Sequence, residues 1–273
     1  MKKLFFSAVL AIASFLCINA QFYGIDVDKL AMLVQQASTL PKDNAILVMS
    51  STMTALSENP AGYRKALEFV ETHLGNPADS LHNEELYITC LEHATQSFVL
   101  GKSEKERPRL LLESAKKNRI GTVASDLEYI TPDGQTHHLT DACDQYTLVY
   151  FNDPDCDACE RVKSRMEQSQ KLKSYVDQGL LKIVGIYPES NQKLWKKSTF
   201  PSWIVNGWDK QQQIENDGAY VMPASLPVFY LLSPDKTVLL KNEPSLNRVE
   251  SALDKVMISS DKDPQSLATL LFN

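Results

Sequence analysis

Basic residues are scarce in this chain, which carries 28 lysine and arginine residues against 34 aspartate and glutamate residues. Its formal net charge is −6 at pH 7. Proteins that bind nucleic acid present a clustered excess of lysine and arginine, and attachment to anionic lipid needs a polybasic segment. Neither pattern occurs, so we expect no nucleic-acid partner and no electrostatic binding to a membrane surface.

Long apolar runs are lacking after the first twenty residues. The apolar run at 4–18 lies between two lysines and a small residue before the cleavage site, which is typical of a secretory signal peptide and too short to cross a bilayer comfortably. We therefore predict removal of residues 1–20, which leaves a net charge of −8. The bulky Leu16 argues against lipidation at Cys17. We expect export across the inner membrane to the periplasm or cell envelope.

A second pair of metal ligands is missing beside the Cys-x-x-Cys motif at 156–159. His137 and His138 are adjacent, so they lie on opposite faces of a strand. The other three histidines are scattered through the first half of the chain: His73, His82 and His93. Zinc sites combine four ligands from paired motifs. We predict no bound metal, and no cofactor.

The segment 21–118 has the pattern of an all-α domain. Asn59-Pro60 places a capping residue before a helical proline, and an apolar stripe follows. Cys90 lies on the apolar stripe of another predicted helix, where we expect a buried small side chain. Ser103-Glu-Lys-Glu106 has the pattern of a capping box, although Pro108 can move the start of that helix by a turn or more.

The cysteine pair at 156–159 carries the chemistry of the chain. The β-rich run Thr147–Phe151 leads into Cys156-Asp-Ala-Cys159, and the following residues have helical apolar spacing. The start of a helix offers unpaired N–H groups and the positive end of its dipole, which favour a thiolate. A disulfide across so short a loop adds little chain-entropy stabilisation, so a purely structural bridge is a poor explanation. The context indicates a redox-active pair.

The surrounding residues predict four further elements. One helix runs from the cysteines to Gly179, and Leu180–Tyr187 is a buried strand, which together make a right-handed β-α-β unit. Antiparallel hairpins are predicted at 126–139 and 226–240, with turns at Pro132-Asp-Gly134 and at 233–236. Four aromatic side chains are assigned to packing ahead of the second hairpin: Trp195, Trp203, Trp208 and Tyr220.

This arrangement resembles the thioredoxin fold, in the secreted branch typified by TlpA-like and ResA-like proteins. The matching features are the Pro-Asp-Gly hairpin, the strand that ends in Cys156-Asp-Ala-Cys159, the β-α-β unit and Leu226-Pro227 before the last hairpin. The resemblance implies an α/β fold with a central mixed sheet flanked by helices. It also implies a cis bond before Pro227, next to the cysteines, and a substrate-binding role for Leu226 and Pro227. We predict Cys156 as the exposed nucleophile and Cys159 as the resolving thiol.

The first half is similar to a family of secreted Bacteroidetes-type proteins in which a helical domain of unknown function precedes a thioredoxin-like domain. The similarity rests on the segments 81–88, 104–111 and 116–126. The predicted organisation is a signal peptide at 1–20, an all-α helical domain at 21–118, a thioredoxin-like domain at 119–257 and a C-terminal tail at 258–273.

Three residues depart from the pattern of that resemblance. Tyr150 stands where thioredoxins have a buried acid six residues before the first cysteine. Val162 stands where ResA-like proteins have a glutamate, and Asp155 replaces the usual tryptophan before the first cysteine. The usual proton relay is therefore in question, with Glu160 or a water molecule as its replacement.

Acidic residues crowd the cysteines between Asp153 and Glu160, and their negative charge opposes thiolate formation at Cys156. A pair without a strongly stabilised thiolate is comparatively reducing, so we expect a thiol–disulfide oxidoreductase that acts on protein clients as a reductase or isomerase. The resemblance implies a membrane thiol electron donor for a reductase. The alternative is a redox-inert binding module whose helical domain recognises a partner. The sequence leaves open whether Cys90 and Cys143 pair.

Overall fold

The computed structural model describes residues 26–77, 79–141, 144–223 and 226–260. The predicted signal peptide, Cys17 and Cys143 lie outside these residues, as does the predicted tail beyond the last helix, which ends at Ser260. The chain divides into two compact units, 1–116 and 117–273. No helix among the described residues is both long and hydrophobic enough to span a bilayer.

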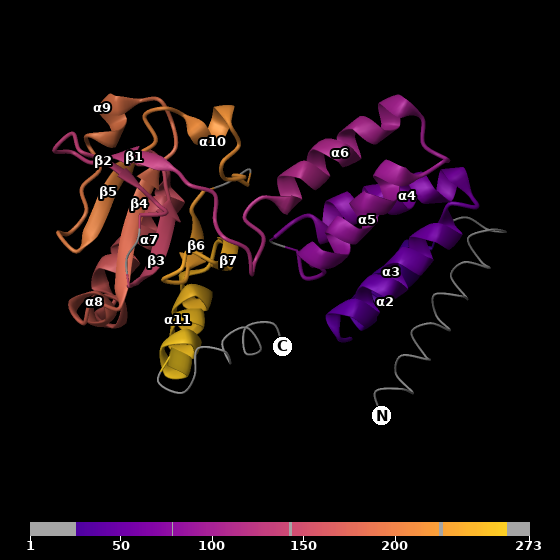
Figure 1. Cartoon of the computed structure of the whole chain (residues 1–273), viewed down its shortest axis with the longest axis horizontal. Helices are drawn as coiled ribbons and strands as arrows, with labels where there is room; N and C mark the ends of the chain where they lie inside the picture. The colour runs from indigo at the N-terminus through magenta and orange to yellow at the C-terminus, as the bar shows by residue number, and fades with distance from the viewer. Residues whose placement is uncertain (1–25, 78, 142–143, 224–225, 261–273) are drawn as a thin grey trace. The chain divides into compact units, whose positions relative to one another are not determined.

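The described part of the first unit is all-helical (Figure 1). Its elements are α2 (Val27–Ala37), α3 (Lys42–Leu56), α4 (Pro60–Phe69), the π-helical turn η1 (Val70–Leu74), α5 (Glu84–Gln96) and α6 (Lys102–Lys116). Their apolar faces form one core, in which Leu33, Met49 and Tyr63 are fully buried. Cys90 is also fully buried there, as the stripe on α5 predicted.

The predicted cap is present at the start of α4 but not at the start of α6. Asn59 caps α4 by accepting from the N–H of Gly62 at 3.1 Å. The predicted capping box at Ser103–Glu106 is wrong, because α6 begins at Lys102 and Glu104 accepts instead from the N–H of Gly101 at 2.8 Å. Pro108 lies inside α6, beyond its first turn, and therefore does not set the start.

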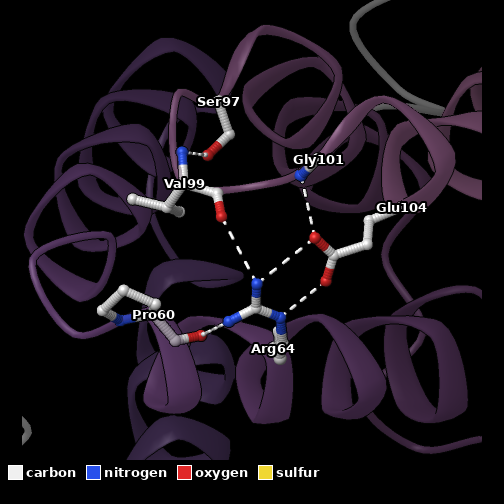
Figure 2. A network of polar contacts seen from close by, with 6 residues as sticks. All are labelled: Pro60, Arg64, Ser97, Val99, Gly101 and Glu104. Carbon is white, nitrogen blue, oxygen red and sulfur yellow. Dashed lines mark hydrogen bonds and ion pairs between the residues drawn. The ribbon is translucent and has the colours of Figure 1, made fainter.

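Glu104 is held in this cap by Arg64 of α4, as Figure 2 shows. The guanidinium donates to both carboxylate oxygens, at 2.6 Å from Nε and 3.2 Å from Nη2. It also donates to the carbonyls of Pro60 at 3.0 Å and Val99 at 3.4 Å. One arginine thus joins the start of α4, the loop before α6 and the first turn of α6, in the bidentate geometry that makes such pairs strong.

The second unit contains a mixed sheet, as the resemblance implied (Figure 1). Its strands in the described residues are β1 (Glu128–Ile130), β2 (Thr136–His138), β3 (Tyr146–Phe151), β4 (Leu181–Tyr187), β5 (Ile204–Trp208), β6 (Val228–Leu232) and β7 (Val238–Glu243). They lie in the order β2-β1-β5-β4-β3-β6-β7. The pairs β3–β4 and β4–β5 are parallel, and the remaining pairs are antiparallel.

Both predicted hairpins and the β-α-β unit are present. β1 pairs with β2 around the Pro132–Gly134 turn, and β6 pairs with β7. The predicted single helix to Gly179 is wrong, since the chain forms α7 (Asp157–Gln168) and α8 (Gln170–Asp177). Ser169 separates them because its backbone is extended and its hydroxyl caps α8 by accepting from the N–H of Leu172 at 3.3 Å.

Different segments cover the two faces of the sheet. Leu148 and Tyr150 of β3 pack into a core with side chains of α7, α8 and α11 (Leu246–Ser260). Val149 and Phe151 point to the other face, where they pack with residues of the first hairpin and with Ile214 of α10 (Gln213–Asn216). This alternation follows from the two-residue period of a strand. It places Tyr150 on the same side of the sheet as α7.

The strand β5 was not predicted. It lies at the side of β4, and Asn206 in its middle accepts from Nε1 of Trp195 on α9 (Gln192–Trp195) at 2.8 Å. Trp195 stacks on Trp208 with ring centroids 5.3 Å apart. The two tryptophans therefore pack structurally, as predicted, and hold the segment after β4 against the sheet.

Candidate active site at the end of β3

Cys156 follows the carboxyl end of β3, an interior strand of the sheet, and directly precedes α7. It is the N-cap residue of α7, with an extended backbone, and its Sγ accepts from the N–H of Cys159 at 3.2 Å. The loop before it is fixed by Asp153, whose carbonyl accepts from the N–H of Cys156 at 3.1 Å and whose Oδ1 accepts from the N–H of Asp155 at 2.9 Å. The thiol is therefore held where helix N–H groups stabilise negative charge on sulfur.

The two cysteines differ in exposure. Cys156 is half-buried, whereas Cys159 is only 2% exposed. Burial, and after it the hydrogen bond with Cys156, raises the pKa of the Cys159 thiol to about 12. A reagent in solution therefore meets the Cys156 thiol first.

The predicted Leu226-Pro227 pair lies beside Cys156. The Leu226–Pro227 peptide bond is cis, as expected. The carbonyl of Leu226 accepts from the thiol of Cys156, with Sγ and O 3.5 Å apart. The four residues predicted for the site are thus brought together, although they come from segments about 70 residues apart in the chain.

Tyr150 supplies a contact that the sequence did not predict. Its hydroxyl donates to the carbonyl of Cys159 at 2.6 Å, and its ring is fully buried against Phe229. Burial, together with the nearby Cys159 and Cys156, raises the pKa of Tyr150 above its usual range. The hydroxyl therefore stays protonated and positions the first turn of α7, so it cannot accept the proton of Cys159.

The surroundings of Glu160 do not favour its predicted role as the replacement proton acceptor. Its side chain is exposed and forms an ion pair with Lys163 at 3.0 Å. Val162, in the position of the ResA-like glutamate, packs against the core beneath α7. The described part of the chain therefore has no buried acid at either of the two family positions.

A cleft of about 530 Å³ opens beside Cys156. Apolar side chains of Ile214, Tyr220 and Met222 line it together with Leu226. Three carboxylic acids also line it: Asp153, Glu189 and Glu215. The sequence places Asp153 beside the cysteines, the resemblance implies a substrate-binding role for Leu226, and Tyr220 is assigned to packing. The sequence did not predict Glu189, Ile214, Glu215 or Met222, because they come from short segments on both sides of β5 that carry no motif.

Asp209 shapes one wall of the cleft. It is fully buried, and its two carboxylate oxygens accept from the N–H groups of Gln213 at 3.0 Å and Ile214 at 2.9 Å. These bonds start the short helix α10, which carries Ile214 and Glu215 into the cleft. Burial raises the pKa of Asp209 even though the backbone bonds favour its charged form.

The histidines make local contacts. His73 pairs with Asp79 at 2.8 Å, and His138 pairs with Asp126 at 2.6 Å. Nδ1 of His93 lies 2.8 Å from the hydroxyl of Tyr63. Among the described residues, no three side chains of histidine, cysteine, aspartate or glutamate are grouped as metal ligands would be.

Known proteins are similar to both units of the chain. Residues 28–118 match a family described as a domain of unknown function, DUF5106. A solved thioredoxin-like protein from Bacteroides caccae is 28% identical, with 84% of this chain and 83% of that chain covered and a TM-score of 0.79.

The C-terminal domain of an uncharacterized protein from Bacteroides fragilis is 34% identical over 50% of this chain and 98% of that chain, with a TM-score of 0.48. No curated protein matches the chain. The described fold, the DUF5106 match and the similarity to the Bacteroides caccae protein agree. This chain belongs to the Bacteroidetes-type thioredoxin-like proteins in which a DUF5106 helical domain precedes a thioredoxin-like fold.

Proposed function

We propose that the chain is an exported thiol–disulfide oxidoreductase that uses the Cys156–Cys159 couple on protein clients. The observation that carries this proposal is the position of Cys156, which is accessible, caps α7 and lies 3.5 Å from the carbonyl of Leu226. Cys159 is buried one helical turn away. This arrangement supports attack by one thiol and release by the other.

In the reducing direction, the Cys156 thiolate attacks one sulfur of a client disulfide. A bond forms between Cys156 and the client, the client disulfide breaks, and the second client sulfur leaves as a thiolate that takes a proton from water. Cys159 then loses its proton and attacks Sγ of Cys156, which closes the Cys156–Cys159 disulfide and releases the remaining client thiolate. Two electrons pass to the client, and an external thiol donor returns two electrons to the pair.

The second step is limited by the proton on Cys159. Burial, with the hydrogen bond to Cys156, raises the pKa of the Cys159 thiol to about 12 in the reduced pair, so this thiol is protonated at neutral pH. Tyr150 does not accept the proton, because its own pKa is raised above the usual range. We propose that water in the cleft beside Cys156 accepts the proton that Cys159 loses. Because this step is slow, we expect the mixed disulfide to persist long enough to be trapped.

The charge around the site supports the reducing or isomerising direction. Three exposed acids lie close to Cys156 in the sequence: Asp155, Asp157 and Glu160. Their negative charge opposes the formation of a thiolate at Cys156. The helix N-terminus acts in the opposite sense. A couple whose thiolate is not strongly stabilised donates electrons more readily than that of a strong oxidase.

The location and partners follow from the same proposal. The predicted signal peptide would deliver the chain to the periplasm or cell envelope, where disulfides form. The clients would be exported proteins with thiols or disulfides, and a membrane thiol protein would supply electrons. The backbone of Leu226 and Pro227 would bind an extended client segment next to Cys156.

The test is to trap the client. Cys159→Ser in the full chain should accumulate a mixed disulfide with a disulfide-containing protein such as insulin, seen on a non-reducing gel, because attack by Cys156 proceeds while release is lost. Cys156→Ser is the matched control and should accumulate none. If neither variant forms an adduct and the native protein does not reduce insulin, the binding-module alternative is favoured.

A further inference from the structure

The cleft beside Cys156 is lined by acidic residues and by no basic residue of the described chain. Asp153 follows β3, Glu189 follows β4 and Glu215 lies on α10, so three separate segments bring a carboxylic acid to its wall. None of these three carboxylates forms an ion pair with a described residue, although Glu215 accepts from the neutral amide of Gln212 at 3.2 Å. Asp153 also accepts from the N–H of Asp155 at 2.9 Å, but no cationic side chain of the described residues balances the three charges in an ion pair.

The negative charge beside the cleft also affects the pKa of Tyr187, at the end of β4. Tyr187 is buried, and its pKa is raised to about 12, first by burial and then by Asp153, Glu189 and Asp155. Two of the three cleft carboxylates, Asp153 and Glu189, thus act on Tyr187 at the end of β4. Glu189 and Glu215 are exposed, so solvent and dissolved salt screen part of this charge.

The cleft is also shaped for part of a polypeptide. About 530 Å³ is room for a few side chains, and Ile214, Tyr220 and Met222 give part of its lining an apolar character. Methionine adapts its shape to varied apolar neighbours. Cys156 and Leu226 form one side, so a segment that binds along the carbonyl of Leu226 would place the residues next to its cysteine in this space.

We propose that this cleft selects client segments that carry a lysine or arginine next to the reacting cysteine. The inference rests on the proposed oxidoreductase function and names the substrate class of the same site. The long stem of a lysine or arginine would pack against the apolar side chains that line the cleft, while its charged end would reach Glu189 or Glu215. Complementary charge acts mainly on the rate at which partners associate, so the selection should appear in the rate of disulfide exchange.

The experiment compares three synthetic peptide disulfides that are identical except for lysine, glutamine or glutamate on both sides of the cysteine. The reduced full-length protein attacks each peptide under pseudo-first-order conditions, and the mixture is quenched with acid and separated by chromatography. Each rate is divided by the rate of the same peptide with dithiothreitol, a neutral thiol, which removes the intrinsic reactivity of the peptide. The ratio of the lysine rate to the glutamate rate is the readout.

We expect the native protein to favour the lysine peptide over the glutamate peptide by about tenfold at low ionic strength, within the range of electrostatic steering. The ratio should fall towards one near 1 M salt, where the Debye length is about 3 Å. Glu189→Gln combined with Glu215→Gln should lower it several-fold. The matched control, Asp144→Asn with Glu167→Gln, removes the same charge from exposed positions outside the cleft and should leave the ratio unchanged.

The outcomes separate this inference from the function on which it rests. Exchange with the glutamine peptide, but a lysine-to-glutamate ratio near one, would overturn the charge selection alone. An equal fall in both double variants would also overturn it, because net charge would then explain the preference. No exchange with any peptide would refute the oxidoreductase proposal itself. Should the cleft variant fail to fold, the single variants Glu189→Gln and Glu215→Gln, each compared with a single control variant, Asp144→Asn or Glu167→Gln, decide the question in the same way.

Discussion

Replacing Tyr150 with phenylalanine removes one buried hydrogen bond and little else. The hydroxyl donates to the carbonyl of Cys159 at 2.6 Å, while the ring stacks on Phe229 at 5.0 Å between centroids and meets Phe200 edge-on at 6.4 Å. Phenylalanine keeps both ring contacts. The lost hydrogen bond is worth about 1 kcal/mol net, and the buried carbonyl left with one partner fewer adds up to about 1 kcal/mol. We expect a loss of about 1 to 2 kcal/mol in the free energy of unfolding.

The measurement is urea unfolding followed by tryptophan fluorescence. All three tryptophans lie in the unit 117–273, so their signal reports that unit alone. The midpoint should fall while the slope of free energy against urea stays constant, because the surface exposed on unfolding does not change. Tyr175→Phe is the control, since it removes a hydroxyl that donates to Asp254 at 3.0 Å at a half-exposed site where water can substitute.

Two results would refute the reasoning on Tyr150. A variant as stable as the native protein would mean that the bond to Cys159 contributes nothing to the fold. Loss of disulfide exchange without loss of stability would mean that the hydroxyl takes part in proton transfer, which the raised pKa of Tyr150 excludes.

Two further predictions concern titration. In the reduced native protein at neutral pH, iodoacetamide should label Cys156 and spare Cys159, because burial raises the pKa of Cys159 to about 12; equal labelling rates, measured by mass spectrometry, would contradict this. Hydrogen bonds from Arg64 lower the pKa of Glu104 from 4.5 to about 2. Because the folded-state pKa lies below the unfolded value, the contribution of Glu104 is present above pH 4.5 and is lost as the pH falls towards 2. Glu104→Gln should therefore be less stable than the native protein at neutral pH, and the two should converge at low pH in thermal unfolding followed by helical circular dichroism.

Local signals predicted the parts of the site that neighbouring residues determine. The strand before Cys156 and the helix after it follow from residue types within a short window, and the capping position of Cys156 follows from both. The approach of Leu226-Pro227 to Cys156 has no local signal, because it depends on β6 pairing beside β3. It was predicted only through the family resemblance.

The strand β5 was hidden by its own composition. Asn206-Gly207 is a turn signal in most sequences, yet both residues lie inside a strand here. A side chain at Gly207 would meet Ile186 at 2.6 Å and Tyr129 at 2.8 Å, so the glycine permits close packing rather than a turn. The side chain of Asn206 is hydrogen-bonded to Trp195, a residue of α9 that lies outside the strand. Such long-range requirements cannot be recognised in a single sequence.

Two errors at helix ends have simpler causes. The apolar spacing from Val162 to Val176 passes over Ser169, whose cap on α8 interrupts the helix without changing the stripe. The capping box before α6 uses Gly101 rather than a serine, because Arg64, from a distant helix, fixes the side chain of Glu104. The acidic side of the cleft escaped prediction for a related reason, since Glu189 and Glu215 meet only in the folded chain.

The reduction potential of the Cys156–Cys159 couple tests the central claim most directly. The full-length protein would be equilibrated in thiol–disulfide buffers of defined potential, and the reduced fraction counted by alkylation and mass spectrometry. We predict one reversible two-electron couple, clearly more negative than about −120 mV, the value of a strong oxidase. Absence of a reversible Cys156–Cys159 disulfide would contradict the redox function, and a value near −120 mV would contradict the reductase or isomerase direction.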